Sequence, residues 1–189
     1  MNRRRSLLHS ITAIPDNYLK INAYAQSCEN MFTDVSVPKE FTIDTTSLLG
    51  FCSFNKLFYT TNSYIQTPVT LNIIGGTEKI NNFDLWLCRR PGIETINGEL
   101  DFSGCASLDR PFLYCSALKN ISVKPGSIHT DFDISSTSVL TSESIESIIG
   151  GLADGESHTL KLNTNQNITQ IQSDAVSAKG WTLSGGAVQ

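Results

Sequence analysis

The chain has 189 residues, a length that suits one domain or a small domain with a short extension. Charged residues make up only 17%, below the quarter that is typical of globular proteins, so uncharged Ser, Thr and Asn must supply much of the polar surface. This composition favours a β-rich extracellular or virion protein over a cytosolic enzyme. The net charge of −4 excludes a basic field for general binding of nucleic acid.

The first segment, residues 1–25, is interpreted as an N-terminal arm. Arg3, Arg4 and Arg5 are either a solvated tail or an anchor for an acidic partner surface. The apolar stretch that follows them is too short and too polar for a secretory signal, and no run of eighteen apolar residues predicts insertion into a membrane. Alternation in Tyr18–Tyr24 predicts a short strand.

Residues 26–139 are predicted to form irregular β repeats. Short β-like runs recur every 20 to 30 residues or so, a period that is typical of stacked repeats in which each repeat contributes one strand to a continuous sheet. The predicted strands are Phe41–Thr45, Val69–Ile73, Glu99–Phe102, Ile121–Val123 and Asp131–Ile134.

The cysteines carry a second repeated signal. Their number is odd and no two are spaced as zinc ligands, so buried free thiols are expected rather than a metal site. A bulky apolar residue precedes most of them by three positions, which predicts one structural slot reused in each repeat. The five are Cys28, Cys52, Cys88, Cys105 and Cys115.

Residues 140–189 are predicted to form a helix-strand-helix-strand unit that caps the repeats. Thr141 is the expected N-cap of a helix over Ser142–Leu152, with Leu140 and Ile145 as a hydrophobic staple. The remaining elements are a strand at Thr159–Leu162, an exposed amide-rich loop at Asn163–Gln172, a helix at Ser173–Lys179 and a strand at Trp181–Leu183.

Two segments resemble known repeats. Cys115–Pro125 and Gly104–Leu108 resemble the repeat of BspA-like leucine-rich proteins, in which a Cys-Ser-x-Leu turn precedes a short strand. Leu140–Leu183 resembles the C-terminal segment of leucine-rich phage structural proteins. The resemblance implies a role in adhesion or virion structure, and it supplies no catalytic residues.

No motif for catalysis or cofactor binding is present. Asp131 and Asp133, with Asp101 and Asp109, suggest a calcium site or a carboxylate pair, and the simpler interpretation is a solvated strand face. No catalytic residue, metal or cofactor is therefore expected.

The sequence predicts an α+β chain, a short and irregular leucine-rich-repeat-type solenoid that is β-rich with helices near the C-terminus. The expected function is that of a non-catalytic phage virion protein in the tail, baseplate or head, acting in assembly or host-surface attachment. A bacterial cell-surface adhesin and a capsid decoration protein without ligand are the alternatives. Expected partners are virion proteins, further copies of the chain, or a host glycan or protein.

Two groups of residues are expected to make these contacts. Arg3, Arg4 and Arg5 would anchor the chain. Trp86, Arg89 and Arg90 would form a recognition loop, because Arg89-Arg90-Pro91 breaks the repeat and is expected to loop outward. Exposed rings on the repeat face would offer stacking platforms for a glycan, and the candidates are Tyr59, Tyr64, Trp86 and Tyr114.

Overall fold

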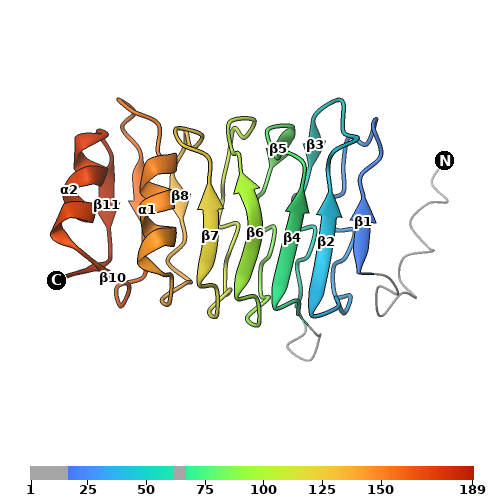
Figure 1. Cartoon of the computed structure of the whole chain (residues 1–189), viewed down its shortest axis with the longest axis horizontal. Coiled ribbons are helices and arrows are strands. Elements are labelled where there is room, and N and C mark those ends of the chain that lie inside the picture. The colour runs from blue at the N-terminus through green and yellow to red at the C-terminus, as the bar shows by residue number, and fades with distance from the viewer. Residues whose placement is uncertain (1–16, 62–66) are drawn as a thin grey trace.

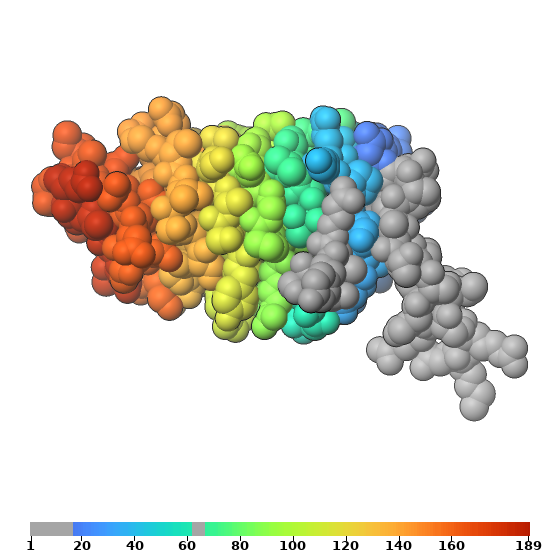
Figure 2. Space-filling model, turned by 90° about the horizontal axis from the view of Figure 1, so that it is seen from below, coloured from blue at the N-terminus to red at the C-terminus, as the bar shows by residue number. Residues whose placement is uncertain are grey.

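The computed structural model describes residues 17–61 and 67–189. Successive segments of the chain lie side by side along one long axis, in the order of the sequence (Figures 1 and 2). A five-stranded parallel sheet fills most of one side, in the order β1 (Tyr18–Lys20), β2 (Glu40–Asp44), β4 (Thr70–Ile74), β6 (Thr95–Leu100) and β7 (Asn120–Val123). We call each turn of the chain around the core, beginning with a strand or a helix on this side, a coil.

A second row of short parallel strands lies across the core. β3 (Cys52–Ser53) pairs with β5 (Ile80–Asn82), and a separate sheet runs in the order β11 (Thr182–Ser184), β9 (Thr159–Lys161) and β8 (Phe132–Asp133). At the C-terminal end, β10 (Asn167–Ile168) pairs with β12 (Ala187–Val188). Every one of these pairings is parallel, which is the geometry expected when each coil repeats the path of the previous one.

Phenylalanine side chains fill the space between the two rows and bind successive coils together. Phe54 packs edge-on against Phe83, Phe83 against Phe102, and Phe112 against Phe132, with ring centroids 5.2–6.3 Å apart. All five rings are buried. Edge-to-face contacts of this kind add to the stabilisation from burial itself.

A tight turn of fixed geometry recurs in each coil. Four residues occupy equivalent positions in successive coils, namely Asn30, Lys56, Leu85 and Arg110. The N–H of each of the first three donates to the carbonyl of the residue that precedes its equivalent in the next coil. All four have positive φ although none is glycine. The repeated left-handed residue shows that the turn is set by stacking of the coils and not by local preference alone.

Two helices replace the sheet strand in the last two coils. α1 (Ser142–Gly151) follows β7 on the same side of the molecule, and α2 (Gln170–Ala178) follows α1 (Figure 1). Thr141 is the N-cap of α1 as predicted, and its side chain accepts a hydrogen bond from the N–H of Ser144. Thr169 and Gln172 form a capping box at the start of α2.

Serine side chains of α1 close the open edge of β7. The hydroxyl of Ser144 accepts a hydrogen bond from the N–H of Ile121 at 3.1 Å and donates one to the carbonyl of Lys119 at 2.9 Å. The hydroxyl of Ser147 accepts from the N–H of Val123 at 2.8 Å. The helix thereby satisfies backbone groups that a further strand would otherwise pair with.

The predicted mixture of many short strands with few helices is confirmed, and most strand positions differ from the prediction by one to four residues. The coils begin inside the predicted arm, since β1 pairs with β2. Residues 1–16, including Arg3, Arg4 and Arg5, lie outside the described residues. The predicted loop Asn163–Gln172 is wrong in part, because it contains β10 and the first turn of α2.

All five cysteines are buried and free, as predicted. Their assignment to one slot per repeat is wrong. Cys52 pairs with Ile80 in the second row, whereas Cys88 aligns with Tyr59, and Cys115 aligns with Arg90. The cysteines therefore fill several different columns of the core, each as a small apolar side chain.

The two glycines at the end of α1 give a matched test of its packing. A Cβ on Gly151 would lie 2.5 Å from Cγ1 of Val123, whereas nothing lies within 4 Å of a Cβ on Gly150. We expect Gly151→Ala to lower the free energy of unfolding by about 1–3 kcal/mol, because it forces α1 away from β7. Gly150→Ala is expected to raise it by about 0.5–1 kcal/mol through helix propensity. Urea unfolding of both variants checks the prediction, and equal effects would contradict it.

Candidate ligand-binding groove

The structure contradicts the predicted recognition loop at two of its three residues. Trp86 and Arg90 are fully buried, with no exposed surface. Arg89 is exposed, and its guanidinium carbon lies 5.2 Å from the centre of the Tyr114 ring. The segment does not loop outward, because the chain turns at Arg89, which has positive φ, and the side chain of Arg90 points into the core.

Arg90 is buried because it ties three coils together through their carbonyl groups. Its Nε donates to the carbonyl of Phe58 at 2.5 Å, and its Nη2 donates to those of Val35 at 3.0 Å and Phe32 at 3.1 Å. Burial lowers the pKa of Arg90 to about 10, so the side chain still carries its charge at neutral pH. Trp86 packs against Phe83 at 4.9 Å between ring centroids.

Among the residues that the structure describes, most of the aromatic rings expected to stack against a glycan are not exposed either. Tyr59 is half-buried, Trp86 lies in the core, and Tyr64 lies outside the described residues. Tyr114 is exposed over 53% of its surface. Of the three candidate rings that the structure describes, Tyr114 alone is therefore placed to stack against a ligand.

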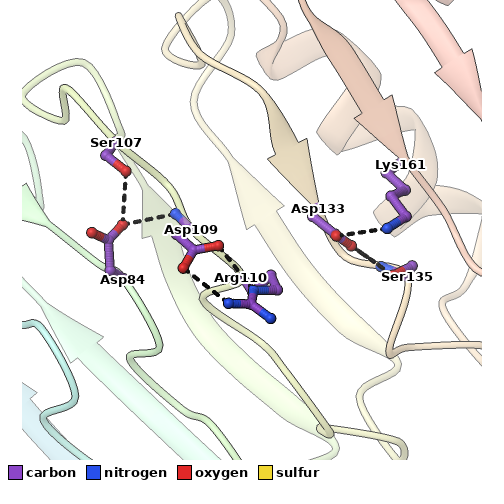
Figure 3. A network of polar contacts seen from close by, with 7 residues as sticks. All are labelled: Asp84, Ser107, Asp109, Arg110, Asp133, Ser135 and Lys161. Carbon is purple, nitrogen blue, oxygen red and sulfur yellow. Dashed lines mark hydrogen bonds and ion pairs between the residues drawn. The ribbon is translucent and has the colours of Figure 1, made fainter.

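Asp109, one of the carboxylates considered for metal or acid–base chemistry, and Asp84 of the preceding coil are held by hydrogen bonds and an ion pair (Figure 3). Asp84 accepts from the hydroxyl of Ser107 at 3.1 Å and from the N–H of Asp109 at 2.7 Å. Asp109 binds Arg110 through both oxygens, at 2.9 and 3.2 Å. These contacts give both carboxylates partners within the chain, so their positions are explained without a bound ligand.

Asp101 and Asp133 each close a turn and also accept a hydrogen bond from a lysine of the next coil. Asp133 accepts from the hydroxyl of Ser135 at 2.6 Å and from Nζ of Lys161 at 3.1 Å (Figure 3). Asp101 accepts from the N–H of Ser103 at 2.9 Å and from Nζ of Lys124 at 2.6 Å. Burial alone would raise the pKa of each carboxyl group, but these hydrogen bonds outweigh it and lower both.

An Asn or Asp that closes a turn onto the N–H two residues later recurs along the chain. This signal is not among the features predicted from the sequence, although it is visible there as an Asn or Asp soon after an apolar run. The residues are Asn22, Asp44, Asn82, Asp101, Asp133 and Asn163. The first and last show that a neutral amide oxygen closes the turn as a carboxylate does.

The turn carboxylates make stability depend on pH in the acid range. Hydrogen bonds from Thr46 and from the Tyr18 hydroxyl lower the pKa of Asp44 to about 2. A group whose pKa is lowered on folding stabilises the chain fully above its unfolded pKa of about 3.9, and that stabilisation is lost as pH falls toward the folded value. The urea midpoint of the parent chain is expected to fall between about pH 4 and pH 2.

Asp44→Asn is expected to flatten this acid dependence and to lower the urea midpoint at pH 7, because the neutral amide oxygen still closes the turn but lacks the charge that strengthens the hydrogen bonds from Thr46 and Tyr18. Asp174→Asn, at an exposed position of α2, is the matched control and is expected to leave the profile unchanged. Urea midpoints at several pH values compare the three chains. Parallel profiles for the parent and Asp44→Asn would contradict the prediction.

A groove of about 500 Å³ lies where the outer face of the sheet meets α1. Its floor is formed by Thr95 and Asn97 of β6 and by Asn120 and Ser122 of β7. Its wall is the first half of α1 with its N-cap, which contributes Thr141, Glu143, Ser144 and Ser147. Figure 1 shows α1 beside β7 on the same side as the strands.

Two features of the strands shape the floor. The pairing of β6 with β7 shifts between Thr95 and Glu99, and Gly98 inside this bulge has a φ of +100°. A Cβ at Gly98 would lie 2.6 Å from the carbonyl oxygen of Ile73, so only glycine fits. The bulge leaves Asn97, Gly98 and Glu99 all exposed on the outer face.

Amide and hydroxyl side chains on this face are held in a ladder across the strands. Nδ2 of Asn97 donates to Oδ1 of Asn72 at 2.8 Å, and Nδ2 of Asn72 donates to Glu40 at 3.1 Å. Nδ2 of Asn120 donates to the hydroxyl of Thr95 at 3.1 Å. These bonds fix the side-chain rotamers before any ligand arrives, which lowers the entropy lost on binding.

The chemistry of the groove is that of neutral hydrogen bonding. Glu143 is the one ionisable side chain among the residues that line it. The lining therefore offers amide and hydroxyl donors and acceptors beside a single carboxylate, and it contains no nucleophile paired with a base. Such a lining suits a hydroxyl-rich or amide-rich ligand.

A scan against protein-family models found no match, and neither the curated proteins nor the solved structures gave one. Within residues 17–61 and 67–189, no group of three or more His, Cys, Asp or Glu side chains is arranged to hold a metal ion. In the same part of the chain, neither helix is long and apolar enough to cross a membrane.

Proposed function

We propose that the chain is a non-catalytic binding module built as a short, irregular leucine-rich-repeat-type solenoid. The parallel pairing of strands that return to one sheet about every 25 residues supports this proposal. The segment that resembles the BspA-like repeat, Cys115–Pro125, also has the expected local form, with a turn before the strand β7.

The ligand of this module is a neutral, hydroxyl-rich molecule such as a surface glycan, bound in the groove between the sheet and α1. The observation that carries this part of the proposal is the ladder of fixed amide and hydroxyl groups on the groove floor. A site built for hydrogen bonding discriminates strongly, because any unmatched polar group is left without a partner on binding. Arg89 and the exposed ring of Tyr114 lie outside this groove and are not needed by the proposal.

Binding to a printed array of bacterial surface polysaccharides tests the ligand class. The parent chain is expected to bind a subset of the glycans, and Asn97→Ala and Asn120→Ala to weaken that binding about tenfold each, as expected for losing a hydrogen bond of about 1.4 kcal/mol. Ser116→Ala, at an exposed position outside the groove, is the matched control. Binding that all three variants share with the parent would exclude the groove as the site.

The biological setting that we propose is a phage virion, with the chain in the tail, baseplate or head. The resemblance of Leu140–Leu183 to phage structural proteins and the low content of charged residues support this setting. Arg3, Arg4 and Arg5 are the proposed anchor to an acidic surface of the particle, and other virion proteins or further copies of the chain are the proposed partners.

Mass spectrometry of purified particles tests this setting. A defined copy number in the particles is expected, and deletion of residues 1–5 is expected to reduce it. A virion-bound chain that lacks any glycan ligand would instead support a capsid decoration protein. Absence from particles, together with retained glycan binding, would support a bacterial surface adhesin.

A further inference from the structure

Two of the five cysteines differ from the others because their sulfur atoms face each other. Sγ of Cys28 and Sγ of Cys52 lie 3.8 Å apart in the core. The two residues belong to successive coils, and the backbone around them is already paired. Ser27 forms a parallel bridge with Ser53, and the N–H of Cys28 bonds to the carbonyl of Ser53 at 2.8 Å.

The thiols of Cys105 and Cys115 face backbone carbonyls instead. Sγ of Cys105 lies 3.1 Å from the carbonyl oxygen of Ile80, and Sγ of Cys115 lies 3.0 Å from that of Leu87. Their thiols therefore donate to backbone carbonyls of the preceding coil. The geometry for a sulfur–sulfur bond is found at the Cys28–Cys52 pair.

The two sulfur atoms are close enough for bond formation after a small movement. Cys28 and Cys52 are diagonal neighbours across the two coils, because Ser27 pairs with Ser53 and the two cysteines lie on opposite sides of that bridge. The sulfur atoms need to approach by less than about 2 Å, which rotation of the side chains with a small shift of the backbone can supply.

The two thiols are also chemically distinct. The hydrogen bond between them lowers the pKa of Cys52 and raises that of Cys28, so Cys52 ionises first and Cys28 keeps its proton. A thiolate is the nucleophile in oxidation, and a second thiol beside it resolves the product.

We propose that Cys28 and Cys52 form an intrachain disulfide when the chain meets a peroxide, and that this bond ties the first coil to the second. The thiolate of Cys52 attacks the O–O bond of hydrogen peroxide, giving a sulfenic acid and releasing hydroxide, which takes up a proton to become water. The thiol of Cys28 then loses its proton and attacks the sulfenic sulfur, and the hydroxyl group leaves as a second water. Two thiols are oxidised and one peroxide is reduced to two waters.

Peptide mapping tests the bond directly. The purified chain is treated with hydrogen peroxide, alkylated in denaturant and digested with trypsin, which separates the two cysteines into peptides 21–39 and 40–56. We expect these peptides to appear joined, with a mass two hydrogens below their sum, and to separate after dithiothreitol. The melting temperature is expected to rise on oxidation, because the bond closes a loop between positions 24 residues apart, and to fall back on reduction.

Two variants make the test specific. Cys52→Ser is expected to abolish the joined peptides and the rise in melting temperature, whereas Cys88→Ser, at a buried cysteine in another column, is expected to preserve both. Cys28→Ser serves in place of Cys52→Ser should the latter fail to fold. Oxidation that leaves peptides 21–39 and 40–56 separate, or that joins other cysteines equally, would overturn the proposal.

Discussion

Arg90→Leu is expected to lower the free energy of unfolding by about 3–5 kcal/mol, because three buried carbonyl groups lose a charged donor and each unsatisfied group costs about 1–3 kcal/mol. Phe32 and Val35 belong to the first coil and Phe58 to the second, so the loss removes the ties of the third coil to two others. Lysine is not expected to rescue the position, because a single ammonium group lacks the planar fork of the guanidinium.

The neighbouring arginine is the matched control. Arg89→Leu removes the same charge from an exposed side chain whose described contact is the ring of Tyr114, a cation–π contact worth about 0.5–1 kcal/mol at an exposed site. Urea unfolding of the two variants compares them. Similar losses at the two positions would contradict the role given to Arg90.

Trp86→Ala is expected to cost about 3–5 kcal/mol, as is typical for removing a large buried ring from a packed core. The side chain is fully buried and contacts the rings of Phe54, Phe83 and Phe112. Thermal or urea unfolding measures the loss.

Trp86→Phe separates the role of the ring from that of its N–H group. The indole Nε1 is buried without a hydrogen-bond partner in the described structure, and an unpaired buried donor costs about 1–3 kcal/mol. Phenylalanine removes that donor while keeping most of the apolar ring, so a net loss of about 1 kcal/mol or less is expected. A loss as large as that of Trp86→Ala would show that the indole N–H has a partner.

The strands of the main sheet could be predicted because their side chains alternate between core and surface. β2, β4 and β7 show buried positions separated by exposed or half-exposed ones, which is the pattern that Phe41–Thr45, Val69–Ile73 and Ile121–Val123 carry in the sequence. α1 could be predicted from the spacing of its isoleucines and from its cap. The two- and three-residue strands of the second row are too short to show any period.

The interior position of Arg90 could not be predicted, since its partners lie 32, 55 and 58 residues away in the chain. An arginine pair before a proline is typical of a surface loop, and nothing local indicates that the second side chain turns inward. In the two adjacent coils the same column holds Thr61 and Cys115, neither of which is charged.

Only some residues of the groove could be predicted from the sequence, and their assembly into one site could not. The amides of the floor are visible in the sequence, but Ser144 and Ser147 look like ordinary surface residues of a helix. Their role in holding α1 against the edge of β7 follows from contacts 23 and 24 residues apart. The wall of the groove is thus a product of packing between coils.

Because α1 closes the edge of β7, the chain can vary in length by whole coils on the N-terminal side of β7. Thr70, Thr95 and Asn120 lie in one row, about 25 residues apart, so a duplicated or deleted unit of that length between β2 and β7 would restore the same row. Such a change would leave the helical end, and with it the wall of the groove, in place. Related genes are therefore expected to differ by whole coils in the middle of the chain, while the segment from β7 through α1 is inherited as one block.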